Sequence, residues 1–466
     1  MPKDQGPLTI HEAAAAIRAG ALTPVDLLEQ CLTRIEDYEP HVRAWVVIDR
    51  DGAREQAERL TAELKRGHDR GPLHGIPVGV KDIIDVFDLP TGCGSKLWAN
   101  SIARRDAECV KRLRQAGAII LGKTVTTAFA YLDPPITRNP WNLDRTPGGS
   151  SSGSAAAVAC GMCLGALGSQ TGGSITRPAA FCGVCSLKPS HGRVSVDGVL
   201  PLAPSLDHVG VMARCVTDLA ILFQVIAGPG EDRDPASRWR VSHIRIPVQD
   251  VITASAGTKK PDAIWQFHQA RGLFETRAEP AIREAMDRLV DHLGHVGQPI
   301  SGVGDVALPP GFSELHARHR TIMAVEAAGF HGPRMARHPE DYPPRIRELV
   351  EEGLRSTAVD YQQARQLREE LWWQIWFMTV ESGLTLLTPA APGPAPDPTT
   401  TGDAVFNAPW SFTGQPTVSF PIAEAADGLP LAVQLVGQDD GEGMLLVRAA
   451  WCEERVGYKM GLPPVP

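Results

Sequence analysis

Two glycine- and serine-rich segments and one lysine are the parts of this chain whose residue types could perform nucleophilic chemistry. The first segment, 146–154, reads TPGGSSSGS, and the second, 171–174, reads TGGS. A third segment, 74–82, reads HGIPVGVKD and places Lys81 at the end of an apolar run. Covalent acyl transfer needs a nucleophile, a proton acceptor and N–H donors for an oxyanion. These segments contain candidates for all three.

A serine nucleophile in this chain would need a base of unusual character. A serine hydroxyl attacks poorly until a base accepts its proton. A lysine can be that base only while neutral, so it must be buried enough for its pKa to fall substantially. Lys81 is the first candidate, and Lys123 is its nearby rival.

Length, composition and charge limit the class of protein. A chain of 466 residues with 43% hydrophobic residues can bury a large core. The net charge of −8 shows no basic excess, which argues against a nucleic-acid partner. Residues 1–6 show no apolar signal region, and no apolar run reaches the roughly 20 residues of a membrane helix. We therefore expect a cytoplasmic protein with no membrane association, whose nine cysteines are reduced.

The elements that must position these residues alternate between helix and strand. Residues 9–66 show helical spacing, with Thr23 as N-cap and Pro24 in the first turn. A helix over 106–115 leads directly into the strand-like residues 118–121. Further strands are expected at 76–80, 417–420 and 431–436. This alternation predicts an α/β fold with a mostly parallel or mixed sheet.

We expect a single domain over 1–466 with four parts. These are N-terminal helices at 1–70, a catalytic core at 71–230, a variable helical cap or pocket region at about 231–410, and a return to the core sheet at 411–466.

Three short motifs match known sites, but the surrounding sequence argues against each. Residues 117–124 fit the P-loop pattern, yet the residues between the glycines are themselves strand-like. Residues 149–153 fit the nucleophile elbow of α/β-hydrolases, but no hydrophobic strand precedes them, and His208 is an isolated candidate for the histidine. Two Cys-x-x-Cys pairs fit a zinc pattern, at Cys160, Cys163, Cys182 and Cys185.

The cysteine pairs favour buried thiols over a zinc site. Each cysteine replaces a small residue in an Ala/Gly-rich stretch, where cysteine behaves as a small hydrophobe. Zinc knuckles lie in weakly apolar sequences that need the metal to fold. Two histidine pairs, His292 with His295 and His316 with His319, are expected on solvated helix faces. We therefore predict no metal site.

The chain resembles the amidase signature family over nearly its whole length. The resemblance rests above all on 147–195, with the runs GGSSSGSAAAVA and GSQTGGSITRPAAFCGVCSLKPSHGRVS. It also covers 74–82, 112–124 and 413–437. The family has a Ser–Ser–Lys triad on one α/β domain, whose mixed sheet is surrounded by helices. The resemblance therefore implies that fold here, no cofactor, and a small-molecule amide and water as the reactants, with a homodimer as one assembly.

Carried over position by position, the resemblance assigns the catalytic roles. It implies that Ser174 is the nucleophile, Ser150 the bridging serine and Lys81 the terminal base, with a cis peptide between Gly149 and Ser150. The oxyanion hole would be formed by the N–H groups of Thr171, Gly172, Gly173 and Ser174. Isolated glycine-serine turns are usually only turns, and a lone lysine after a strand is usually solvated. Two such turns and the lysine segment together, at the family's spacing, favour the catalytic interpretation.

Several residues differ from the family pattern, and these differences bear on which substrate the protein would accept. Ser169 and Gln170 stand where many members have Thr-Asp, and Thr176 stands where many have arginine. The arginine comes one position later, at Arg177, which argues against the amidotransferase that acts on glutamyl-tRNA. Arg177 could bind a substrate carboxylate or make a structural hydrogen bond. Candidate substrate contacts are Ala130, Gln170 and Arg177.

The sequence does not choose between amides, carbamates and ureas as substrates. Several aromatic residues could line the pocket, although large aromatics are more often core. They are Phe129, Trp141, Trp410 and the cluster Trp372, Trp373 and Trp376. The activity predicted is that of an amidohydrolase acting on linear amides. The alternatives are a urethane hydrolase and a component of an amidotransferase complex.

Overall fold

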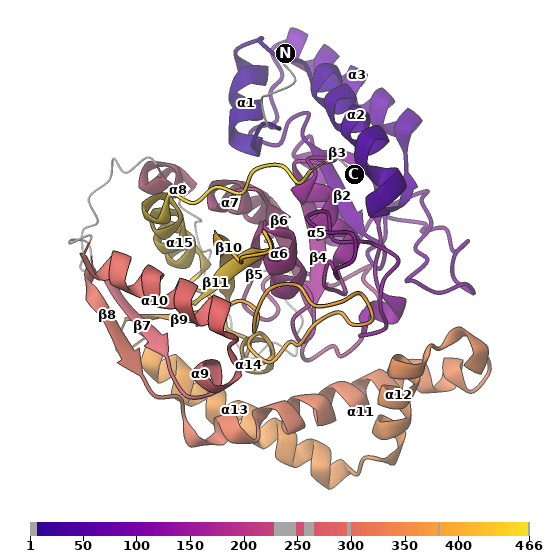
Figure 1. Cartoon of the computed structure of the whole chain (residues 1–466). Coiled ribbons are helices and arrows are strands. Elements are labelled where there is room, and N and C mark those ends of the chain that lie inside the picture. The colour runs from indigo at the N-terminus through magenta and orange to yellow at the C-terminus, as the bar shows by residue number, and fades with distance from the viewer. Residues whose placement is uncertain (1–6, 228–247, 256–264, 296–299, 381–382, 465–466) are drawn as a thin grey trace.

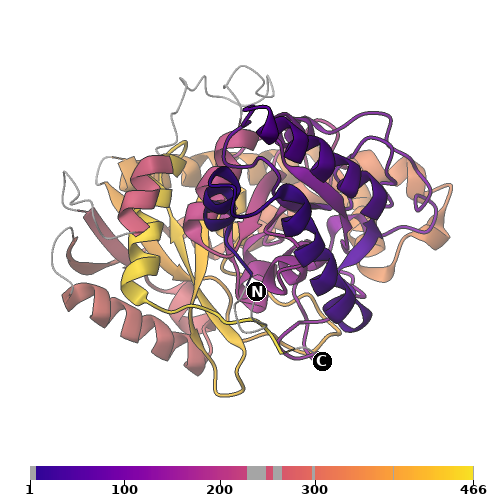
Figure 2. The ribbon, with the colours of Figure 1, turned by 90° about the horizontal axis from the view of Figure 1, so that it is seen from above.

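A computed structural model describes residues 7–227, 248–255, 265–295, 300–380 and 383–464. The fold is α/β, built on one mixed sheet of eleven strands in the order β1-β3-β2-β4-β6-β5-β10-β11-β9-β7-β8. Helices surround this sheet (Figures 1 and 2). The predicted fold class is therefore confirmed.

The strands are β1 Trp45–Ile48, β2 Pro77–Lys81, β3 Ile119–Thr124, β4 Gly165–Gln170, β5 Cys185–Lys188, β6 His208–Ala213, β7 Trp265–Ala270, β8 Ile300–Val306, β9 Leu384–Pro389, β10 Thr417–Glu424 and β11 Pro430–Val436. The longer helices are α1 Ile10–Arg18, α2 Pro24–Val42, α3 Arg50–Lys65, α4 Glu108–Gln115, α5 Ser152–Ala159, α6 Thr176–Cys182, α7 Val216–Ile226, α8 Val248–Ser255, α10 Pro280–His295, α11 Leu315–Met335, α12 Pro344–Arg355, α13 Ala358–Val380, α14 Ala408–Thr413 and α15 Glu442–Val456.

The sheet has parallel strands at two places. Strand β2 lies between β3 and β4 and is parallel to both. At the other end of the sheet, β7 is parallel to β9 and β8. The strands between, from β4 through β6, β5, β10 and β11 to β9, pair antiparallel. The active-site candidates fall at the carboxyl ends of the first parallel group.

The N-terminal helices begin and end where the sequence signals predict. Thr23 caps α2 because its hydroxyl oxygen accepts from the backbone N–H of Asp26 at 3.1 Å, and Pro24 is the first helical residue. The stretch 9–66 is not wholly helical, however, because β1 lies between α2 and α3 and pairs antiparallel with β3. The C-terminal segment returns to these helices, where Tyr38 donates to the carbonyl of Pro463 at 2.8 Å (Figure 2).

The segment expected to be a helical cap contributes to the sheet as well. Strands β7, β8 and β9 all lie within 231–410 and form one end of the common sheet. Helices α11, α12 and α13 extend as an arm beside the core, coloured orange in Figure 1. Residues 231–247, 256–264, 296–299 and 381–382 of this segment lie outside the described residues.

The aromatic residues divide between core and surface. Phe129 and Trp410 are buried, as the core interpretation predicts. The tryptophan cluster on α13 is not core: the rings of Trp372, Trp373 and Trp376 pack on one another, and Trp373 is 49% exposed. In the ranges that the structure describes, no helix has the length and apolar character needed to cross a membrane.

Candidate active site

Strand pairing brings the candidate base to its partners. Lys81 is the last residue of β2, and its parallel neighbour β4 ends at Gln170, with Val80 opposite Leu167. Parallel strands present their carboxyl ends at one sheet edge, where ligands commonly bind in α/β folds. There the Nζ atom of Lys81 lies 2.7 Å from the Oγ atoms of both Ser150 and Ser169.

The environment of Lys81 favours the neutral amine. Its side chain is fully buried, and this burial lowers the pKa of Lys81 well below its usual value. The negative charge of Asp207 opposes the shift, and the positive charge of Arg177 adds to it. A neutral amine held against a serine hydroxyl can accept its proton.

Ser150 and Ser174 lie in adjoining loops. The peptide bond from Gly149 to Ser150 is cis, and the N–H of Ser151 donates to the carbonyl of Ser174 at 3.3 Å. Both serines belong to the described residues, and no hydrogen bond joins their hydroxyls there. Catalytic hydrogen bonds are often long in unliganded enzymes and shorten when substrate binds. Ser174 lines a cavity of about 320 Å³.

The carbonyl groups of the turn after β4 accept hydrogen bonds from the surrounding protein. The carbonyl of Thr171 accepts from His319 Nε2 at 2.9 Å, and that of Gly172 accepts from Ser411 Oγ at 3.0 Å. The carbonyl of Gly173 accepts from the N–H of Arg177 at 2.9 Å. In a trans peptide the C=O and the following N–H point in opposite directions. The N–H groups of residues 172–174 therefore point away from His319, Ser411 and Arg177.

His319 is a site residue that the sequence pattern assigned wrongly. It was expected on a solvated helix face, but it is 5% exposed and lines the cavity from α11. Burial lowers the pKa of His319 to about 4, so its ring is neutral near pH 7. The 148 positions between His319 and Thr171 leave no local sequence signal for this contact.

Asp207 also holds the turn, through Thr171. The Thr171 hydroxyl donates to Asp207 Oδ1 at 2.5 Å, and the N–H groups of Leu202 and Ala203 donate to Oδ2. Burial raises the pKa of Asp207 to about 6, against these hydrogen bonds, which lower it. The turn is thereby fixed on two sides.

The three candidate substrate contacts occupy different positions. Ala130 and Arg177 both line the cavity. The two terminal nitrogens of Arg177 already donate to the carbonyls of Gly402 and Gly149, at 2.8 and 2.7 Å. These contacts favour a structural role for Arg177 over the binding of a substrate carboxylate. Gln170 is not among the residues that line the cavity, and its side chain donates instead to Ser411 at 3.0 Å.

Two departures from the family pattern meet in space. The Oε1 atom of Gln170 accepts from the N–H groups of Ile175 and Thr176, at 2.8 and 3.0 Å. Gln170 thus holds the first turn of α6 while its Nε2 reaches Ser411, which binds Gly172. Both sides of the turn that carries Ser174 depend on this one amide.

The rival bases are occupied elsewhere. Lys123 forms a buried ion pair with Asp82 at 3.0 Å and donates to the Pro90 carbonyl at 2.9 Å. His208 Nδ1 lies 2.7 Å from the carbonyl of Leu206, and burial lowers the pKa of His208 well below its usual value. The residues that line the cavity include neither of them.

The rejected motifs have structural positions that match the reasons given against them. Three of the four residues between the glycines of the P-loop pattern lie in β3, and no strand directly precedes the serine-rich loop that leads into α5. Cys160, Cys163, Cys182 and Cys185 are buried free thiols. Within the described residues, these four cysteines do not form a group of potential metal ligands.

The cavity mouth carries charge. Arg277 and Asp403, both lining the cavity, form an ion pair at 2.9 Å. His316, one turn before His319, also lines it and has a pKa lowered by burial. Apolar side chains, with Leu202 and Met323 among them, make up another part of the lining.

Known proteins resemble this chain over nearly its whole length. A family model described as Amidase matches residues 26–446. The protein named "Putative amidase AmiD" of Mycobacterium bovis is 35% identical over 474 residues, covering 98% of this chain and 96% of the relative. A glutamyl-tRNA(Gln) amidotransferase component from Roseiflexus sp. is 35% identical over 471 residues, covering 94% of each. A solved amidase structure shares 33% identity with a TM-score of 0.84, covering 96% of this chain and all of the other.

Proposed function

The chain belongs to the amidase family, and from that premise we propose that it hydrolyses the C–N bond of a small amide through an acyl-enzyme on Ser174. Ser150 relays the proton, and Lys81 is the terminal base. The observation that carries this proposal is the fully buried Lys81, held 2.7 Å from Ser150 beside the turn that bears Ser174. A buried neutral lysine against a serine has little purpose in a purely structural site, where an apolar residue would cost less.

The proposed reaction proceeds in two halves. Ser174 Oγ attacks the carbonyl carbon while its proton passes to Ser150, whose own proton passes to Lys81. The oxyanion accepts hydrogen bonds from N–H groups of residues 171–174. The C–N bond then breaks, and the amine leaves with the proton returned through Ser150. Water attacks the acyl-enzyme by the same relay and releases the carboxylic acid and Ser174.

The cavity favours a small substrate. Its volume of about 320 Å³ is near the lower end of the range for ligand pockets. A linear amide is the substrate class that we propose, and carbamates and ureas are the alternative because the same relay would cleave them. A cavity of this size suits a small acyl group.

A second candidate function is that of a component in an amidotransferase complex. The similarity to the Roseiflexus amidotransferase favours it, since that relative matches over 94% of both chains. The positions of Thr176 and Arg177, which differ from the pattern of that enzyme class, argue against it. Such a component would depend on partner chains, whereas an amide hydrolase is active alone.

The experiment uses the purified full chain without added proteins. A panel of aliphatic, aromatic, carbamate and urea substrates is incubated with it, and released amine or ammonia is measured. We expect turnover of at least one small amide and none by Ser174→Ala, with native activity in Ser313→Ala, which changes an exposed serine. Native turnover by Ser174→Ala would overturn the assignment of the nucleophile. Activity only after a partner is added would favour the amidotransferase alternative.

A further inference from the structure

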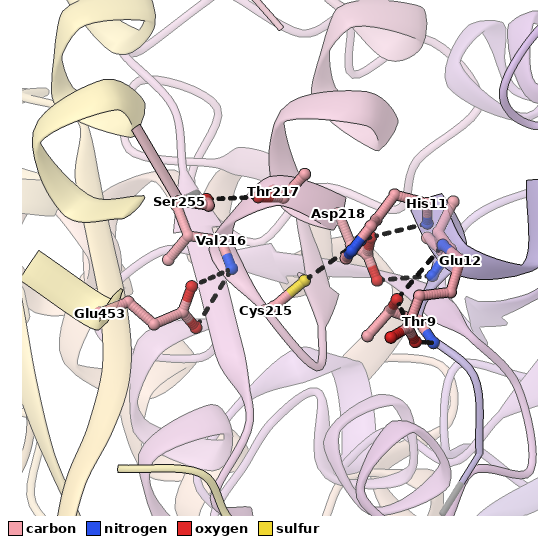
Figure 3. Close-up of polar contacts among 10 residues, drawn as sticks. Thr9, His11, Glu12, Cys215, Val216, Thr217, Asp218, Ser255 and Glu453 are labelled. Atoms are coloured by element: carbon pink, nitrogen blue, oxygen red, sulfur yellow. Dashed lines mark hydrogen bonds and ion pairs between the residues drawn. The ribbon is translucent and has the colours of Figure 1, made fainter. Parts of the chain in front are cut away.

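A second and larger cavity lies apart from the candidate active site. Its volume is about 650 Å³, and it is bordered by α1, the start of α7, α8 and the C-terminal segment. The two cavities share no lining residue. His11, Cys215 and Glu453 line this second cavity, and Figure 3 shows the side chains around it.

Three potential metal ligands converge at its wall. His11 Nδ1 lies 2.9 Å from Asp218 Oδ1 and 3.9 Å from Cys215 Sγ (Figure 3). The ligand atoms of these three residues all lie within 4.8 Å of one another. A Cys–His–Asp relay would use both ring nitrogens of the histidine, one for each partner. Here both contacts meet at the same nitrogen, which is the arrangement of ligands around a common point.

Acidic and basic side chains both lie around this point. Glu12, which follows His11 in α1, and Glu453 both line the cavity. Glu453 is fixed there because its carboxylate accepts from the N–H of Val216 at 3.0 Å. Two cationic residues, Arg214 and Lys459, line the same cavity.

The ligand group is oriented by contacts around it. Asp218 is buried, and its carboxylate accepts from the N–H groups of Ile10 and His11, at 2.7 and 3.1 Å. These bonds hold the first turn of α1 on α7. Outer hydrogen bonds of this kind orient ligands in metal sites. The contact between α1 and α7 therefore holds the three side chains close to one another.

We propose that His11, Cys215 and Asp218 bind one transition-metal ion of the zinc class, with a further coordination position that faces the cavity. Nitrogen, sulfur and oxygen ligands together suit such an ion, and three protein ligands leave a position open to water or a small molecule. Binding deprotonates the thiol of Cys215, so a proton is released. The site is separate from the four cysteines whose spacing resembles a zinc pattern.

The test is a titration of the full chain after removal of bound metal. Cobalt(II) is the probe, because a cobalt–thiolate bond gives a charge-transfer absorption, and zinc is then added to displace it. We expect one ion per chain, an absorption that Cys215→Ala abolishes, and affinity at least about tenfold weaker in His11→Gln, in line with the loss of one ligand. His295→Gln, which changes an exposed histidine outside the cavity, should bind as the unmodified chain does.

The outcomes separate this proposal from the proposed function. Saturable binding that both variants weaken supports the site, and the half-exposed His11 keeps the test decisive if Cys215→Ala fails to fold. No saturable binding, or equal binding by the unmodified chain and His11→Gln, overturns it. Ser174→Ala should bind cobalt unchanged, so metal binding and amide hydrolysis succeed or fail independently.

Discussion

His319 Nε2 donates a hydrogen bond of 2.9 Å to the carbonyl oxygen of Thr171. This contact joins helix α11 of the orange arm in Figure 1 to the turn that bears Ser174. Because the carbonyl is held, the following N–H is directed the other way. A residue outside the glycine- and serine-rich segments thus helps to set the geometry of the proposed oxyanion hole.

Replacing His319 by alanine should lower kcat by about tenfold and change KM less. Direct loss of an oxyanion donor costs on the order of 10²–10³ in rate, and loss of a partner that orients the donor should cost less. His316→Ala is the matched control, since His316 lines the same cavity but holds no carbonyl of the turn. Steady-state kinetics on one substrate compare them. Equal losses in both variants would contradict this role for His319.

Gly173→Ala should reduce activity far more than Gly172→Ala. A Cβ atom at Gly173 would lie 2.8 Å from Asn407 Oδ1 and 2.9 Å from Ala404 Cβ, so the turn must shift. At Gly172 the nearest atom would be His319 Cε1, at 3.4 Å. We expect a loss of about 10² or more in kcat for the first, as when an oxyanion donor is displaced, and under about tenfold for the second. Circular dichroism checks that both variants fold.

The activity should rise with pH through the ionisation of Lys81. A lysine is a base only when neutral, and burial lowers the pKa of Lys81 well below its usual value. The acid limb of the kcat profile should therefore lie well below the usual lysine pKa of about 10.4, with the optimum on the alkaline side of neutral. Lys81→Ala should remove most of the rate and this limb. Lys81→Arg should do no better, because guanidinium does not deprotonate in this range.

Lys123 provides the comparison for Lys81. Its ammonium pairs with the buried Asp82, so Lys123→Ala leaves a buried carboxylate without its ion-pair partner. Breaking such a pair commonly costs about 3–5 kcal/mol of stability. We expect a lower unfolding midpoint and an unchanged acid limb in the activity that remains. Native activity in Lys81→Arg would turn attention to Lys123 instead.

Stability should fall on acidification because of buried neutral histidines. His331 packs against Phe129 and Tyr342, and burial lowers its pKa to about 4. Since the unfolded value is about 6.5, the unfolded chain binds the proton first as pH falls, and stability is lost between these two values. Between pH 7 and pH 5, His331 alone should account for about 2 kcal/mol. Urea titrations at both pH values should show a smaller loss in His331→Gln, and an equal loss would refute the assignment.

Chelation should leave amide hydrolysis unchanged. The proposed relay through Lys81, Ser150 and Ser174 uses no metal, and the candidate metal site lines the other cavity. Activity is measured before and after treatment with a chelator, and zinc content is measured in parallel. Loss of activity together with stoichiometric zinc would overturn the metal-free mechanism.

The sequence predicted the segments of the candidate active site because each is a local pattern. Lys81 ends an apolar run that forms β2, and the glycine turn at 171–174 directly follows β4. The N-cap at Thr23 was predicted for the same reason, since the bond joins residues three apart. The fold class followed from the alternation of helices and strands. Each of these signals lies within a few residues of the feature that it predicts.

What could not be predicted depends on contacts between distant segments. Ser169 resembles any other strand serine until β2 and β4 pair and place it against Lys81. His319 sits in a polar helix and becomes buried only because α11 covers the cavity. Strand β1 was missed because its four residues, between two helices, are too few to show a strand pattern. Trp373 was expected in the core because large aromatic residues are usually buried, but the sequence does not show which residues surround it.

Arg177 links the loop that contains Gly149 to the loop at 400–405. One guanidinium donates to the carbonyl of Gly149, next to the proposed relay serine, and to the carbonyl of Gly402, beside the cavity-lining residues 403–405. A mutation that reshapes the loop at 400–405 should therefore also disturb the loop that carries the proposed relay serine. Changes of substrate preference in this enzyme should come more readily through α11 side chains than through grafted versions of the 400–405 loop.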